Sequence, residues 1–213
     1  MASRKSSLSG VRKKELLPLI SASAVLRNYG DFSKLLTIAR RKRIPFNKIY
    51  EALLQNYLFA GYPSAILSLK QLKENYPAKR LSKAADMNLY HFRKRGIINC
   101  RKVYGDKSEK LISNVKQFSP DLAEWLVLEG YGKVLGREGL SFKERELCIV
   151  AVLTVLGFED QLYSHINGAF RVRASIEEIR KVINNLSLIG KKSLTEFGLK
   201  VLMRFEKAKG IRK

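Results

Sequence analysis

The sequence predicts an all-α protein, and two observations carry that prediction. Apolar residues recur at helical spacing along almost the whole chain, whereas the alternation typical of strands is scarce. Helix starts are also marked: Ser119 is followed by a proline, and Ser141 and Ser175 each precede a glutamate by three residues, the spacing of a capping box. We therefore expect helices near residues 14–28, 32–43, 46–59, 63–75, 79–95, 107–117, 120–135, 142–156, 159–173, 176–189 and 193–208.

Boundary signals support these helices in chain order. Glycines, which commonly follow the last residue of a helix, stand near five of the expected ends: Gly30, Gly61, Gly96, Gly157 and Gly190. A proline begins helix 120–135, and the two capping boxes begin helices 142–156 and 176–189. The other helices rest on apolar spacing. The stretch 96–106 lacks these signals and is expected to be irregular.

The composition is that of a globular protein in a reducing compartment. The chain has 213 residues, 46% of them hydrophobic, and no apolar run approaches the roughly 20 residues that span a membrane. Cys100 and Cys148 are far apart and indicate neither a disulfide framework nor a metal site, so we expect a cytoplasmic protein without a metal. The N-terminus faintly resembles a signal peptide, but Pro18 interrupts its short apolar run and Glu15 directly precedes it, which favours a first helix.

Charge is strongly and unevenly positive. The net charge is +22; residues 1–118 hold 25 Lys and Arg against 7 Asp and Glu, whereas residues 119–213 hold 16 against 12. Such a field attracts anions, including nucleic acid, acidic lipid or an acidic substrate, and a merely solvated basic surface is the alternative. We expect a basic N-terminal half over residues 1–96, a connector over 97–118 and a more balanced C-terminal half over 119–213.

The two halves share a weak internal similarity. Residues 44–54 resemble residues 174–183, and each segment runs through an apolar helix into a turn and a further helix. Aligning Ile49 with Ile179 places Leu35 opposite His165. The N-terminal half is therefore predicted to be a degenerate repeat that lacks the histidine.

Glu146 and His165 are the candidate catalytic residues. From Leu147 onward the helix 142–156 is apolar on nearly every face, so it is predicted to be buried, with Glu146 at its N-terminal end. His165 lies on the apolar face of the next helix. If the two helices form a tight hairpin around Gly157, a carboxylate and an imidazole meet where water is scarce and can move protons at neutral pH. The alternative is a buried hydrogen bond that only stabilises the packing.

Several short motifs of the C-terminal half occur together. They are Ser119-Pro-Asp-Leu-Ala, Gly130-Tyr131-Gly132, Gly139-Leu140, Arg145-Glu146-Leu147, Gln161-Leu162, His165-x-x-Gly168-Ala169 and Glu177-Glu178-Ile179. As an ensemble they resemble the carboxymuconolactone decarboxylase family of the alkylhydroperoxidase-D-like superfamily. The resemblance covers residues 118–190, about a third of the chain, and implies an alkylhydroperoxidase-D-like helical fold that assembles into homo-oligomers.

The resemblance also bears on the chemistry. Redox members of the family carry Cys-x-x-Cys between the glutamate and the histidine; the matching positions here are Phe158 and Gln161, so this chain is not expected to be a thiol peroxidase. What remains resembles the decarboxylase branch, a carboxy-lyase chemistry that removes carbon dioxide from 4-carboxymuconolactone without a cofactor. Leu135, where many members carry tryptophan, and residues 189–193 depart from the family pattern, which leaves the natural substrate open.

The same resemblance implies roles for five residues. His165 is the general acid/base, and Glu146 orients it or shares its proton. Gln161 is expected to donate a hydrogen bond to a lactone oxygen, Arg145 to hold a carboxylate of a small anionic substrate, and Tyr131 to line the pocket. A surface ion pair for Arg145 and a packed aromatic for Tyr131 are the alternatives.

Two functions outside catalysis stay open. A nucleic-acid-binding protein would use the basic runs 40–43 and 93–95 and would stack bases on Tyr57, Tyr62, Tyr76 and Tyr90, although no RNA- or DNA-binding motif is present. A vestigial oligomeric scaffold would keep the fold without turnover.

Overall fold

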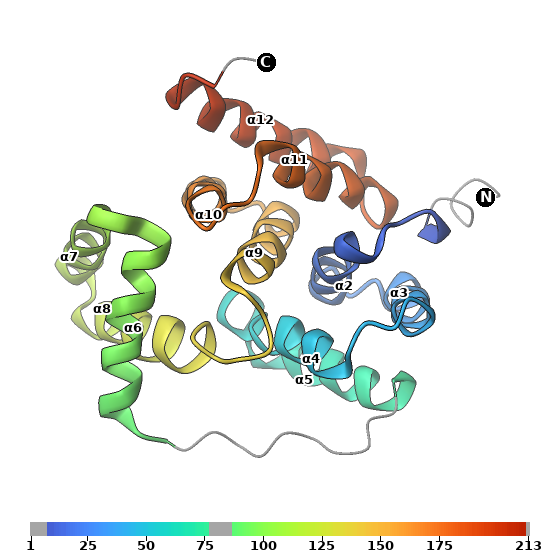
Figure 1. Cartoon of the computed structure of the whole chain (residues 1–213), viewed down its shortest axis with the longest axis horizontal. Helices are drawn as coiled ribbons and strands as arrows, with labels where there is room; N and C mark the ends of the chain where they lie inside the picture. The colour runs from blue at the N-terminus through green and yellow to red at the C-terminus, as the bar shows by residue number, and fades with distance from the viewer. Residues whose placement is uncertain (1–7, 77–86, 212–213) are drawn as a thin grey trace.

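The computed structural model describes residues 8–76 and 87–211, which form helices and contain no strand (Figure 1). The all-α prediction is confirmed. The helices are α2 (Leu16–Val25), α3 (Tyr29–Arg41), α4 (Phe46–Leu54), α5 (Tyr57–Asn75), α6 (Leu89–Tyr104), α7 (Ser108–Phe118), α8 (Pro120–Trp125), α9 (Phe142–Leu156), α10 (Glu159–Arg171), α11 (Ile176–Asn185) and α12 (Lys192–Ala208). Short 3-10 turns η1 (Lys13–Glu15), η2 (Gly105–Lys107) and η4 (Leu186–Leu188) and a π-helix η3 (Leu126–Val134) complete the chain.

Two apolar helices form the centre of the molecule. α9 is buried continuously from Arg145 to Val155, and α2 from Leu16 to Ala24, as expected for helices that are apolar on every face. They pack against each other, and Figure 1 shows α4 and α5 below them, α11 and α12 above them, and α6 to α8 at the left. The core therefore joins both halves of the chain in one body.

The two halves repeat their element bounds at a spacing of 130 residues. α3 spans Tyr29–Arg41 and α10 spans Glu159–Arg171, while α4 and α11 begin at residues 46 and 176. Arg43 and Arg173, in the turns before α4 and α11, both have a positive φ, 53° and 69°. The same spacing pairs Ile49 with Ile179. From these matched bounds we infer two helical repeats, in line with the internal similarity of the sequence.

The prediction that residues 96–106 are irregular is wrong. α6 runs through Gly96 to Tyr104, and η2 follows it directly. The helix expected near residues 107–117 is confirmed as α7. Gly96 does not end a helix. It lets α6 cross η3 closely, since a Cβ there would collide with the carbonyl oxygen of Val127. Gly132 of η3 makes the reciprocal approach to Phe92.

Smaller differences concern helix boundaries. The expected helix 120–135 divides into α8 and the π-helix η3, and the first part of the expected helix 79–95 lies outside the described residues. In the described part of the chain, no helix combines the length and the apolar character needed to cross a bilayer.

Candidate active site

Glu146 is held near the start of α9. The Ser141 side chain accepts a hydrogen bond from the backbone N–H of Glu144, and the Glu144 carboxylate accepts one from the N–H of Ser141, which completes the predicted capping box. This cap fixes the first turn of α9. Glu146 comes directly after that turn, where the helix enters the core. Its side chain is only 1% exposed.

His165 reaches Glu146 across a tight helical hairpin. Gly157 ends α9 in the left-handed conformation, with φ 78°, and α10 then runs back beside α9. The distance between His165 Nδ1 and Glu146 Oε2 is 2.8 Å. The imidazole is 8% exposed and the carboxylate 1%, so the small exposed part of the pair belongs to the histidine. The contact that the sequence led us to expect is present; its catalytic role is a proposal.

Gly168 makes room for the Glu146 carboxylate. It lies one turn after His165 on α10 and is buried. A Cβ at this position would stand 2.8 Å from Glu146 Oε2 and 2.7 Å from Val103 Cγ1, closer than side chains pack. The absence of a side chain at Gly168 is therefore a requirement of the Glu146–His165 contact.

Aromatic side chains enclose the imidazole. The rings of Phe59 and Tyr104 meet the His165 ring edge to face, with centroids 5.7 and 6.4 Å away. Tyr131, on the π-helix η3, donates a hydrogen bond of 2.9 Å from its hydroxyl to that of Tyr104. Burial raises the pKa of both tyrosines, and the charge of Glu146 adds to the increase, so both hydroxyls stay protonated at neutral pH.

Phe59 and Tyr104 are functional candidates that the sequence did not reveal. They come from α5 and α6, far from the motifs of the C-terminal half, and Tyr104 falls in the stretch that was expected to be irregular. No local pattern in the sequence marks either ring as part of a site. Tyr131, which the sequence did indicate, is buried and reaches the cluster through Tyr104.

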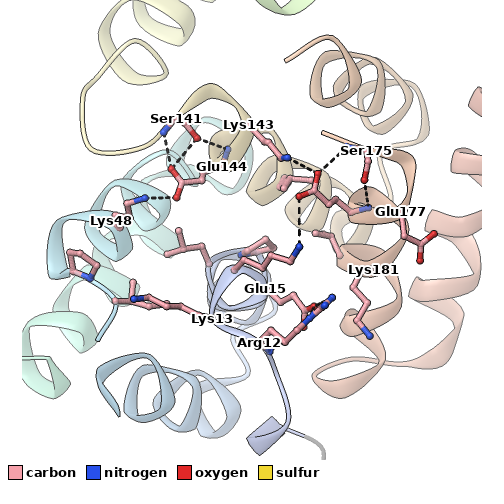
Figure 2. A pocket seen from close by; sticks show the side chains of 18 of the residues that line it. Arg12, Lys13, Glu15, Lys48, Ser141, Lys143, Glu144, Ser175, Glu177 and Lys181 are labelled. Carbon is pink, nitrogen blue, oxygen red and sulfur yellow. Dashed lines mark hydrogen bonds and ion pairs between the residues drawn. The ribbon is translucent and has the colours of Figure 1, made fainter. Parts of the chain in front are cut away.

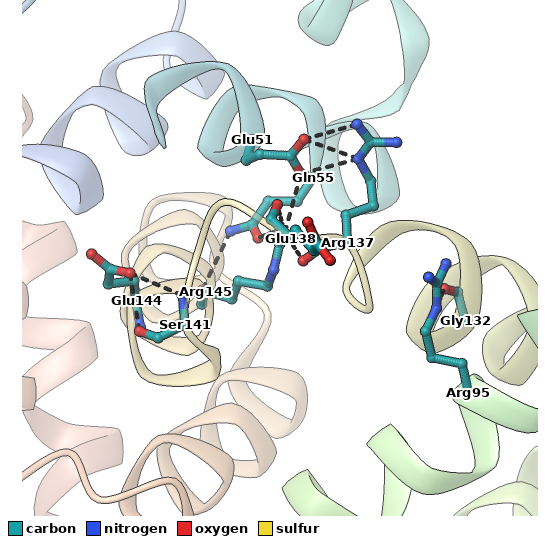
Figure 3. A network of polar contacts seen from close by, with 9 residues as sticks. All are labelled: Glu51, Gln55, Arg95, Gly132, Arg137, Glu138, Ser141, Glu144 and Arg145. Carbon is teal, nitrogen blue, oxygen red and sulfur yellow. Dashed lines mark hydrogen bonds and ion pairs between the residues drawn. The ribbon is translucent and has the colours of Figure 1, made fainter. Parts of the chain in front are cut away.

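Arg145 lies in a buried network instead of facing a ligand (Figure 3). Its guanidinium is 3.1 Å from a Glu51 carboxylate oxygen and donates to the Gln55 side chain and to the backbone carbonyls of Arg137 and Glu138. Burial lowers the pKa of Arg145, and the hydrogen bond and charge of Glu51 oppose that shift. Glu51 also pairs with Arg137. This arrangement favours a structural role for Arg145 over the substrate contact that the family resemblance implied.

Gln161 is the last of the five predicted site residues. Gln161 is exposed and lies one turn before His165 on α10. Cys100 and Cys148 are buried, free thiols, and burial raises the pKa of each to about 12. Within residues 8–76 and 87–211, no group of three metal-binding side chains comes together.

The tyrosines considered for base stacking divide into two groups. The Tyr57 ring is half-buried and stacks on the Tyr62 ring, with centroids 5.1 Å apart, and Tyr76 is buried, so neither offers an exposed ring on which a base can stack. Tyr62 and Tyr90 are exposed. The nucleic-acid alternative therefore loses two of its four stacking residues.

Comparison with known proteins agrees with this geometry. The profile of the carboxymuconolactone decarboxylase family matches residues 120–201, which include Glu146 and His165. The chain is 31% identical over 156 residues to Peroxisomal protein 2 of Schizosaccharomyces pombe, covering 71% of this chain and 73% of that protein. It is 30% identical over 96 residues to 4-carboxymuconolactone decarboxylase of Acinetobacter baylyi, covering 45% of this chain and 72% of that enzyme. The chain belongs to the carboxymuconolactone decarboxylase family.

Proposed function

We propose that His165 and Glu146 form an acid/base pair that transfers a proton to or from a carbon atom of a small organic anion. The observation that carries the proposal is the contact of 2.8 Å between Nδ1 and Oε2, made between two buried side chains. The similarity to 4-carboxymuconolactone decarboxylase supports decarboxylation of a conjugated lactone acid as the reaction.

In this proposal the two side chains have separate tasks. Because Glu146 engages Nδ1, the other ring nitrogen, Nε2, is left to exchange a proton with a substrate. The carboxylate orients the ring and stabilises the imidazolium that forms when Nε2 takes up a proton. The 8% exposure of the imidazole provides the side from which the substrate approaches.

The proposed reaction has two steps. The bond between the ring carbon and the substrate carboxylate breaks, carbon dioxide leaves, and the electron pair passes into the conjugated lactone to give a dienolate. His165, as imidazolium, then donates its Nε2 proton to carbon and is reprotonated from solvent. The substrate itself accepts the electrons, so the scheme uses no cofactor.

Neighbouring hydroxyl and amide groups suit the developing charge. The Tyr104–Tyr131 pair stays neutral and can donate a hydrogen bond, since burial raises both pKa values. In this proposal Gln161, which is exposed one turn before His165, donates a hydrogen bond to the lactone oxygen. Arg145 has no part in this proposal because its guanidinium is engaged by Glu51 and Gln55.

Assembly and location extend the proposal. Three large apolar side chains at the end of α7 and on α8, Phe118, Leu122 and Trp125, are exposed, which supports a homo-oligomer that covers them. Light scattering of the purified protein measures the subunit number. A cytoplasmic location stays a prediction, and one relative carries a peroxisomal name, so a fluorescent fusion of the full chain is needed to separate the two locations.

Turnover of 4-carboxymuconolactone by the parent and two histidine variants tests the proposal. The chain has two histidines, and His91 is exposed on α6, which makes His91→Gln a matched control. We expect His165→Gln to lose about 10²–10⁴-fold in kcat with its fold retained, and His91→Gln to match the parent. Full activity of His165→Gln would refute the acid/base role, and an inactive parent would refute the substrate.

A further inference from the structure

A pocket separate from the Glu146–His165 pair lies between the two halves of the chain. It has a volume of about 860 Å³ and is bordered by η1, α2, the start of α4, the start of α9 and the start of α11. Neither Glu146 nor His165 lines it. We call it the junction pocket; Figure 2 looks into it, with Lys48 and Glu144 on one side and Lys181 on the other.

The junction pocket is built from matched positions of the two halves. Lys13 and Lys143 line it together, as do Leu17 and Leu147, and the members of each pair are 130 residues apart. This is the spacing that relates α3 to α10 and α4 to α11. The pocket therefore forms where the two inferred repeats face each other, and no single loop creates it.

Its lining carries an excess of positive charge. Seven basic and four acidic residues line the pocket. Three of the carboxylates are matched by close partners: Glu15 by Arg12, Glu144 by Lys48 and Glu178 by Lys143. The fourth carboxylate, Glu177, forms no ion pair within the described part of the chain. Seven cations against four carboxylates leave an excess of three positive charges around the pocket.

Several cations are left without a partner. Among the described residues, Lys13, Arg43 and Lys181 form no ion pair, and Lys14 lies 4.0 Å from Glu178, which already binds Lys143. The helix N-termini at Ser141 and Ser175 are closed by their own glutamates, so they add no free donors. The attraction for an anion therefore comes from the unpaired side chains.

The remaining lining is aliphatic. It consists of Leu17, Pro18, Ile44, Pro45, Leu147 and Val182, and no aromatic side chain is among the lining residues. Such a surface suits methylene groups and offers no ring on which a base or an aromatic acid can stack. A volume of this size accommodates a small organic molecule together with its charged group.

We propose that the junction pocket binds an organic anion that joins an aliphatic body to a phosphate or carboxylate group. The unpaired cations Lys13, Arg43 and Lys181 supply the charge that attracts the anionic group, and the aliphatic body lies on Leu17 and Leu147. This site is independent of the proposed reaction, since it shares no side chain with the acid/base pair.

Titration calorimetry of the full chain with octyl phosphate, octanoate, methyl phosphate and octanol tests the proposal. We expect both octyl anions to bind, with affinity rising about fourfold for each buried methylene added between methyl and octyl phosphate. Affinity should fall with added salt, as for a charge-dependent contact. Stronger binding of octyl phosphate than of octanoate would assign the anionic group as a phosphate, and the reverse as a carboxylate.

Paired variants locate the site. Lys13→Gln/Lys181→Gln should weaken the binding of the preferred octyl anion by at least about tenfold. Lys110→Gln/Lys116→Gln, on the exposed face of α7 and outside the pocket, removes the same charge and should leave the affinity unchanged. His165→Gln should bind like the parent, which distinguishes this proposal from the proposed reaction. Equal weakening by both double variants, equal affinity for methyl and octyl phosphate, or no binding by the parent would overturn it.

Discussion

Gly168→Ala is expected to disturb the acid/base pair from within the helix that carries His165. The added Cβ would lie 2.8 Å from Glu146 Oε2 and 2.7 Å from Val103 Cγ1, both below the 3.0 Å that Cβ atoms keep from other atoms. The carboxylate is held by a hydrogen bond of 2.8 Å to His165 and is almost fully buried, so it has little space into which it can move. Relief of the clash must therefore shift either the carboxylate or α10.

Two opposing contributions set the size of the effect. An alanine within a helix is favoured over glycine by about 1 kcal/mol. Overpacking of a buried site costs about 1–3 kcal/mol, which leaves a net loss of up to about 2 kcal/mol in the free energy of unfolding. Turnover should suffer more, because a shift of a few tenths of an ångström in a proton-transfer group reduces the rate by about tenfold or more.

Urea unfolding followed by circular dichroism measures the stability, and turnover of 4-carboxymuconolactone measures the activity. Gly30→Ala is the matched control, since Gly30 lies in the first turn of α3 with no atom within 4 Å of an added Cβ. Val103→Ala in the Gly168→Ala background should recover part of the loss by removing one of the two clashes. If Gly168→Ala is as stable and as active as Gly30→Ala, the close packing around Glu146 is not what the structure shows.

Three further predictions concern charge and burial. Glu51→Ala should cost about 3–5 kcal/mol in urea unfolding, because it leaves the buried guanidinium that Glu51 neutralises without a counter-charge; a loss below about 1 kcal/mol would contradict this. Cys100 and Cys148 should not react with Ellman's reagent at pH 8 until the protein is unfolded, since burial raises both pKa values to about 12; two rapidly reacting thiols in the native protein would be inconsistent with it. The hydrogen bond from Lys143 lowers the pKa of Glu178 below 4.5, so Glu178 stabilises the fold above that pH and the contribution is lost as pH falls through the lowered value. The difference in Tm between the parent and Glu178→Gln should therefore shrink from pH 6 to pH 3, and a constant difference would argue against the role of the charge.

The pair at the centre of the candidate site was predictable because its signals are local. Glu146 lies near the start of a helix that is otherwise apolar on nearly every face, and a capping serine begins that helix. Gly157 reverses the chain, so that α10 runs back beside α9 and brings His165 next to Glu146. Helical periodicity and hairpin geometry are short-range properties. They suffice to bring two side chains nineteen positions apart to within 2.8 Å.

Arg145 shows where local signals fail. The family resemblance implied a cation beside a substrate, but the partner that decides its role is Glu51, which lies 94 positions earlier on α4. Gly96 is a second case. The sequence does not distinguish a glycine that ends a helix from a glycine that permits a close helix crossing. The short distance between Gly96 and the carbonyl of Val127 on η3 shows that Gly96 is of the second kind.

The sequence alone determined that the chain is helical, that α9 is buried at its centre, and that a glutamate and a histidine meet across one turn. Each of these features depends on contacts between residues that are near in the sequence. The surroundings of the pair could be found only in the tertiary structure. They are Phe59 and Tyr104 beside the imidazole, the ion pair of Glu51 with Arg145, and the junction pocket between matched helices. These contacts join segments separated by tens of residues or more, and their formation depends on how whole helices pack, which no local spacing of side chains specifies.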